Sequence, residues 1–224
     1  MPDKVSFTYN EYILLLTAFA AGTVDLISFA TLGGVFASAM TGNFALLAYY
    51  VAQGESHAAM GSVVALIGFT IGCAGAVLQR RGHAQAQALN VLLGTEAALL
   101  LFFAVYALWT PNVSHAPSDH LQVLLLAVAM GMQGVIGQTV SLTTIVFTTT
   151  LTKLVSTIAD SIVNGDLSAL KDVKIQSSVV VSYLFGALLS GTLIVHHAEG
   201  VVLLPFIGVA LAFAMHRLSQ RRAS

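Results

Sequence analysis

Long uninterrupted runs of apolar residues dominate the hydrophobic pattern of this chain. Eight runs follow a short polar beginning, at residues 12–31, 32–53, 57–78, 90–109, 121–137, 138–163, 175–195 and 201–216. Most of them approach the roughly 20 residues that a helix needs to cross a hydrocarbon core. Because the runs are continuous and do not alternate with polar positions, they predict membrane helices and exclude a transmembrane barrel.

Two pairs of runs are joined without a polar loop between them. Residues 12–53 would form a single helix of about 63 Å at 1.5 Å per residue, about twice the thickness of the membrane core. The segment must therefore turn or break, and Gly33 and Gly34 are the residues best suited to the break. In the second pair, the β-branched run 140–150 has the same effect. We expect non-helical backbone near 33–41 and 144–151, each followed by a half-helix.

The two halves of the chain also align with each other. A shift of 111 residues places 35–41 on 146–152, and a shift near 114 places Gly72 on Gly186. This alignment predicts one membrane domain over 1–224, built from two repeats. Repeat one covers 11–109 and repeat two covers 121–217. Each contains one broken, re-entrant unit, an extended segment plus half-helix, and two simple transmembrane helices.

The positions of Lys and Arg predict the orientation, because positively charged loops stay in the cytoplasm. Suppose that each broken unit, with the run before it, makes an odd number of crossings. The chain then crosses about six times, and eight Lys and Arg residues lie inside with none outside; Lys153, within a run, is not counted. If all eight runs span fully, the split becomes six to two. We therefore expect both termini in the cytoplasm and the two repeats inverted.

Composition narrows the class of protein. Of the 224 residues, 57% are hydrophobic and only 8% are charged, whereas soluble domains carry about 25% charged residues. The net charge of −1 suggests no nucleic-acid partner. A lone cysteine, Cys73, can form no internal disulfide and fits no metal-binding spacing. The sequence thus predicts an all-α polytopic membrane protein in contact with the lipid bilayer, without a cofactor or metal.

Breaks at matching positions of two repeats are typical of transporter binding sites. Two half-helices that begin near the midplane would direct two positive dipole ends at one point, which suits an anion or the oxygen-rich end of a polar solute. The structural alternative is a pair of packing kinks on Thr/Gly-rich surfaces. Thr41 is expected to cap its half-helix, and Gly42 to let a ligand approach the backbone. The expected solute-binding residues are Thr41, Gly42, Asn43, Gln133, Thr149, Thr150, Thr152 and Lys153.

Four ionisable residues lie within the apolar runs, where a charge costs roughly 2.5–3.5 kcal/mol on an insertion scale. Asp25 and Glu96 are the candidates to carry a coupling proton, and Asp25 is expected to be protonated, hydrogen-bonded or paired. Lys153 could bind an anion or neutralise Asp25. Asp160 lies near the end of its run and is expected to be solvated.

Short motifs in the first half resemble a known family. The segments 22–25 (GTVD), 32–36 (LGGVF) and 40–43 (MTGN), with Ser38 between them, resemble the signature of the YoaK family of bacterial inner-membrane proteins. Residues 130–133 (MGMQ) and the Thr-rich run resemble its second half. This resemblance implies the fold and an inner-membrane location but no function. Separately, an extended segment feeding a half-helix resembles uracil and sulfate transporters at the level of fold alone.

These observations favour a small secondary transporter, or permease, for a small polar solute, an anion more than a cation. No Ser-His-Asp, HExxH, GxGxxG or P-loop pattern occurs, which disfavours an enzyme. Two alternatives stay open. One is a passive channel of the same fold, insensitive to proton or sodium gradients. The other is a non-transporting membrane interaction or assembly protein, with tightly packed breaks. A homodimer is plausible, because 23.4 kDa leaves little scaffold around a moving site.

Overall fold

The computed structural model describes residues 8–110, 117–140, 147–164 and 170–223, and these residues form helices and no strand. The elements are α1 (Tyr9–Thr31), α2 (Met40–Gln53), α3 (Ser56–Arg80), α4 (Gln85–Trp109), α5 (Pro117–Thr139), α6 (Phe147–Asn164), α7 (Leu170–Val195), the 3-10 helix η1 (Glu199–Leu203) and α8 (Leu204–Ala223). Within this described part, six helices are long and apolar enough to cross a membrane: α1, α3, α4, α5, α7 and, with η1, α8. The predicted all-α class and the number of about six spans are therefore confirmed.

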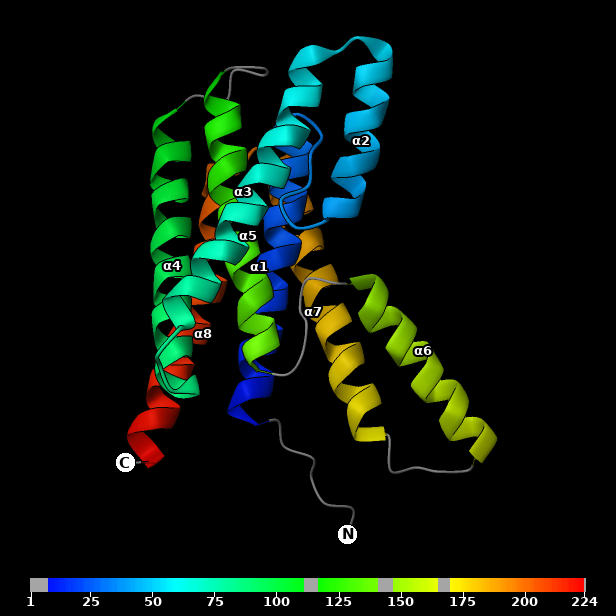
Figure 1. The fold of residues 1–224 in the computed structure, drawn as a ribbon, viewed down its shortest axis with the longest axis vertical. Helices are drawn as coiled ribbons and strands as arrows, with labels where there is room; N and C mark the ends of the chain where they lie inside the picture. Colours follow the sequence, from blue (N-terminus) through cyan, green and yellow to red (C-terminus); the bar gives the residue numbers. More distant parts are fainter. Residues whose placement is uncertain (1–7, 111–116, 141–146, 165–169, 224) are drawn as a thin grey trace.

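The long helices run alternately up and down the long axis of the molecule (Figure 1). In that view α1 rises, α3 descends and α4 rises, whereas α5 descends, α7 rises and α8 descends. The shorter α2 runs in the direction of α1, and α6 runs in the direction of α5. Both short helices begin near the middle of the long axis and run toward opposite ends. Because the long helices alternate in direction, α1 begins and α8 ends at the same end of the bundle (Figure 1).

Two helix pairs cross with their backbones in direct contact because glycines face one another's helices. In the α1–α7 crossing, a Cβ atom on Gly22 would overlap a backbone carbonyl of α7, and one on Gly186 would overlap a carbonyl of α1. In the α3–α5 crossing, Gly72 and Gly131 face the opposite backbone in the same way. Small residues of this kind allow close helix packing in membranes, where no hydrophobic force drives helices together.

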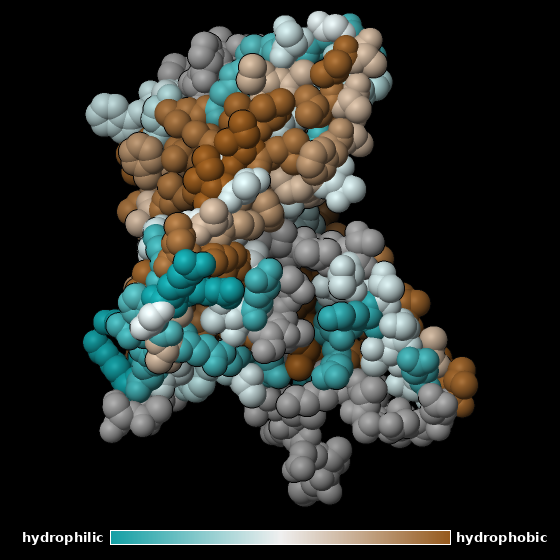
Figure 2. Space-filling model, in the orientation of Figure 1, coloured by the Kyte–Doolittle hydropathy of each residue, from teal (hydrophilic) through white to brown (hydrophobic). Residues whose placement is uncertain are grey.

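The apolar side chains divide between an internal core and an outer surface. The core lies around α1 and α5, which are the most deeply buried spans, and includes Ile13, Leu93, Phe103, Leu126 and Met130. On α3 and α7, by contrast, large apolar side chains such as Ile71 and Leu188 are exposed. Figure 2 shows the resulting brown surface over much of the upper half of one face, with teal residues gathered below it. An exterior of this composition suits contact with lipid.

The structure corrects the expected second break. Residues 147–151 were expected to be non-helical, but α6 already begins at Phe147; residues 141–146 lie outside the described part of the chain. The preference of β-branched residues for extended backbone is weak, and tertiary context readily overrides it. The first break is confirmed over residues 32–39, and it ends slightly earlier than expected because α2 begins at Met40.

Candidate functional site

The break between α1 and α2 begins at two glycines. Gly33 and Gly34 have φ angles of +89° and +75°, in the left-handed region that glycine adopts without a steric penalty. The helix ends just before them, where the Leu32 N–H donates to the Ser28 carbonyl. The chain then folds back along α1, and this reversal brings Ser38 level with a residue that precedes it by 13 positions.

That residue is Asp25, which is only 3% exposed. Its Oδ1 accepts a hydrogen bond from the backbone N–H of Ser38 at 2.8 Å. Its Oδ2 accepts from the Ser38 hydroxyl at 2.5 Å and from the Tyr183 hydroxyl on α7 at 2.9 Å. The carboxyl group therefore joins α1, the break and α7. The expectation that Asp25 is hydrogen-bonded is confirmed, and its partners here are hydroxyl and amide groups.

Asn43 holds the break from the other side. Its side chain is fully buried, its Oδ1 accepts from the Phe36 N–H at 3.0 Å, and its Nδ2 donates to the Phe36 carbonyl at 2.6 Å. This pair of hydrogen bonds imitates the pairing between two strands. It satisfies backbone groups that would be costly to leave unpaired inside a membrane. In this conformation the predicted solute-binding amide of Asn43 stabilises the break.

One expectation for the start of α2 is corrected. Thr41 was expected to cap the helix, but α2 begins at Met40, its N-cap Ala39 provides no side-chain hydrogen bond, and Thr41 is exposed. The tether of Ser38 to Asp25 fixes the chain just before this start. Gly42, where a ligand was expected to approach the backbone, lies against the Phe36 ring: a Cβ placed there would be 3.2 Å from that ring. That ring occupies the space and stacks on Phe29, with centroids 4.8 Å apart.

The predicted solute-binding residues of the second half lie in the first two turns of α6. Thr149, Thr152 and Lys153 are exposed, and Thr150 is half-buried. Neutralisation of Asp25, one of the two roles considered for Lys153, is not among the contacts that hold Asp25. Further along the helix, Asp160 is exposed, as expected.

Two more polar side chains lie within the core. Gln133 on α5 is fully buried and donates from Nε2 to the Thr17 carbonyl on α1 at 2.9 Å, which ties the two central helices together. Glu96 on α4 is also fully buried, and neither carboxyl oxygen has a hydrogen-bond partner among the described residues. An ionised carboxylate without donors is costly in an apolar interior. The Glu96 site therefore suits a neutral carboxyl group.

Tyr183 is the member of this cluster that sequence reasoning missed. A signal for it exists, because membrane tyrosines usually lie at the interfaces, whereas this one is near the middle of the run 175–195. A phenol in that position usually needs a hydrogen-bond partner. The sequence did not indicate that the partner would be Asp25, which is 158 positions away.

The fold and the buried polar cluster define a multi-pass helical membrane protein. The chain belongs to the family described as "Protein of unknown function (DUF1275)", which matches residues 13–215. It is also similar to the UPF0700 transmembrane protein YoaK of Bacillus subtilis (strain 168), with 28% identity over 192 residues, covering 81% of this chain and 82% of that protein. No solved structure gives a significant match. The resemblance to the YoaK family is thus confirmed.

Proposed function

We propose that this protein is a small secondary transporter, a permease for a small polar solute, with an anion favoured. The observation that carries the proposal is the non-helical segment 32–39, which folds back among long apolar helices and is held by buried Asp25 and Asn43. Irregular backbone at membrane depth is tolerated only where protein or a wet cavity surrounds it, and transporters place their solute sites there. The proposed location is the bacterial inner membrane, with both termini cytoplasmic.

We further propose that 11–109 and 121–217 are inverted repeats. The support comes from helix direction and from glycine packing. In Figure 1, α5 runs opposite to α1, and α7 runs opposite to α3. If α1 is exchanged with α5 and α3 with α7, the α1–α7 crossing becomes the α3–α5 crossing. The exchange aligns Gly22 with Gly131 and Gly72 with Gly186. Under this proposal α2 and α6 are the two half-helices, and their N-terminal ends form the solute site with Gln133.

The coupling proton is assigned to Asp25, with Glu96 as a second carrier. Hydrogen bonds to a carboxylate are roughly twice as strong as those between neutral groups. Protonation of Asp25 would weaken its bonds to Ser38 and Tyr183 and release the break from α7. Movement of the break would withdraw the Phe36 ring from Gly42 and expose the start of α2. Glu96 already lies where a neutral carboxyl group is favoured.

A flux assay on the full chain reconstituted in liposomes tests the proposal. The solutes are labelled formate, acetate, phosphate and sulfate, with urea as an uncharged polar solute, each measured with and without an imposed pH gradient. We expect gradient-dependent uptake of at least one anion, which Asp25→Asn lowers by roughly tenfold or more. Asp160→Asn, which changes an exposed carboxylate on α6, is the matched control and should leave uptake unchanged. Uptake at the same rate with and without the pH gradient would instead favour a passive channel of the same fold.

One observation favours the second candidate, a non-transporting interaction or assembly protein. The Phe36 ring covers Gly42, and Asn43 is engaged by backbone, so the break is packed in this conformation. That candidate predicts no flux of any of these solutes through correctly folded protein. It also predicts that Asp25→Asn changes stability alone. A homodimer remains a prediction, which native mass spectrometry in nanodiscs can decide.

A further inference from the structure

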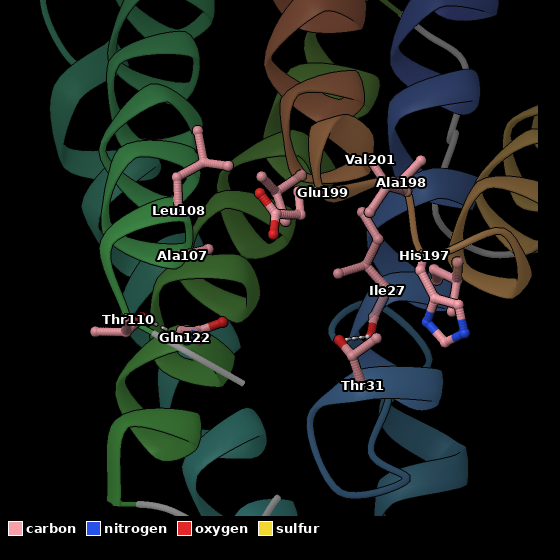
Figure 3. A pocket seen from close by; sticks show the side chains of 12 residues that line it. Ile27, Thr31, Ala107, Leu108, Thr110, Gln122, His197, Ala198, Glu199 and Val201 are labelled. Carbon is pink, nitrogen blue, oxygen red and sulfur yellow. Dashed lines mark hydrogen bonds between the residues drawn. The ribbon is translucent and has the colours of Figure 1, made fainter. Parts of the chain in front are cut away.

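A cavity of about 380 Å³ lies at the end of the bundle away from the chain termini, where α1, α4 and α7 end and α5 begins. We call it the end pocket. It lies between the two halves of the chain and beside η1 (Figure 3). Its volume is within the range of about 300–1,000 Å³ that is usual for small-molecule sites. The solute-binding and proton-carrying residues discussed above do not line it.

The polar side chains of the end pocket present hydrogen-bond acceptors. Thr31 and Thr110 donate their hydroxyl protons to carbonyls of their own helices, at 2.7 and 2.8 Å, so toward a ligand these hydroxyl oxygens act as acceptors. Gln122 donates from Nε2 to the Thr110 hydroxyl at 3.3 Å and keeps its Oε1 as an acceptor. The Glu199 carboxylate points toward Leu108 across the cavity (Figure 3).

The helix ends and charged residues around the end pocket also favour a positively charged ligand. Three helices (α1, α4 and α7) end at the cavity and two helical segments (α5, and η1 continuing into α8) begin there, so partial negative helix ends outnumber positive ones by one. Residues 82–152 and 175–216 contain no Lys or Arg. The bordering ends of α4, α5, α7 and η1 therefore place no permanent positive charge beside Glu199. His197, the other ionisable residue in the described part of the lining, lies on the opposite side of the cavity near Thr31 (Figure 3).

The rest of the lining is apolar, from Ile27, Ala107, Leu108, Ile194, Val201 and Val202. We propose that the end pocket binds a small organic cation, an ammonium group on a compact hydrocarbon body. The ammonium group donates to Glu199, and the hydrocarbon packs on the isoleucine and valine side chains. An anion would bring negative charge to the Glu199 carboxylate and further acceptors to the threonine oxygens. A bare metal ion would leave the apolar wall uncovered. This site is independent of the proposed transport.

Three probes of one shape test the proposal: benzylammonium, benzyl alcohol and benzoate. Binding is measured by isothermal titration calorimetry on the full chain in nanodiscs, with protein-free nanodiscs as the blank for partition into lipid. We expect benzylammonium to bind roughly tenfold or more tightly than benzyl alcohol, and benzoate not to bind. Equal affinity for the alcohol, or preference for benzoate, would overturn the assignment.

Variants locate the binding. Glu199→Gln should weaken benzylammonium binding by roughly tenfold. Glu55→Gln, at an exposed carboxylate that does not line the cavity, should leave binding unchanged. An equal effect of both variants would mean general surface charge and overturn the proposal. If Glu199→Gln does not fold, Leu108→Trp decides, since it fills the cavity from a half-exposed position and should abolish binding. Asp25→Asn should retain full binding, which separates this test from that of transport.

Discussion

The α1–α7 and α3–α5 crossings share their packing but differ in their chemistry. In each crossing, one glycine from either helix lies against the opposing backbone. Three residues after Gly22 on α1 comes Asp25, and three residues before Gly186 on α7 comes Tyr183. Their side chains meet in a 2.9 Å hydrogen bond. The first crossing therefore adds a buried carboxyl group to its glycine contact.

The second crossing has other residues at the corresponding places. Three residues after Gly131 on α5 comes Gly134, and three residues before Gly72 on α3 comes Phe69. The polar contact recorded here is weak, from the Cys73 thiol to the Gly131 carbonyl at 3.3 Å. Close packing is thus common to the two halves of the chain. Among the described residues of these two glycine contacts, the buried carboxyl group belongs to the first crossing and has no counterpart in the second.

The largest effect is expected from substitutions that disrupt the glycine–backbone contact shared by the two crossings. Gly22→Val and Gly131→Val each place a side chain where the facing backbone lies, so we expect each to destabilise the fold by about 3 kcal/mol or more. Thermal unfolding and the monodisperse fraction in detergent measure the loss. Gly75→Ala is the control, because a Cβ at that position meets no atom within 4 Å. Tolerance of one valine and not the other would show that the crossings are not equivalent.

A smaller effect is expected where the crossings differ. Tyr183→Phe removes one donor from the buried Asp25 and should destabilise the protein by about 1.5–3 kcal/mol, the usual range for a hydrogen bond to a charged group. Tyr49→Phe, at an exposed tyrosine, should change little. Reversible unfolding in mixed micelles compares the two. An unchanged stability in Tyr183→Phe would mean that the Asp25–Tyr183 bond contributes nothing to the crossing.

The sequence predicted those features that depend on composition along a single segment. The spans follow from apolar length, and the first break follows from Gly33 and Gly34, which favour positive φ angles. The burial and hydrogen bonding of Asp25 follow from the cost of a carboxyl group within an apolar run. Each of these inferences needs no knowledge of which helices are neighbours.

Features that depend on neighbours could not be predicted in this way. The partners of Asp25 are set by the fold-back of the chain and by the approach of α7, which brings Tyr183 to it. The role of Thr41 was misjudged because the tether at Ser38 fixes where α2 can begin. The exposure of Lys153 could not be predicted either, because repeat register along the sequence does not determine which face of α6 meets the bundle.

The smallest expected effect concerns the break itself. Asn43→Ala leaves the Phe36 N–H and carbonyl without their side-chain partner, which should cost about 1–3 kcal/mol. Because the damage is local, we expect it to appear mainly as faster amide hydrogen exchange across residues 32–39, with little change in α3 or α4. Thr41→Ala, two positions earlier at an exposed side chain, should leave this exchange unchanged. Equal exchange in Asn43→Ala and the native chain would mean that Asp25 alone fixes the break. In that case the hydrogen bonds of Asp25 to Ser38 and Tyr183, which distinguish the α1–α7 crossing from the α3–α5 crossing, would be sufficient to hold the break.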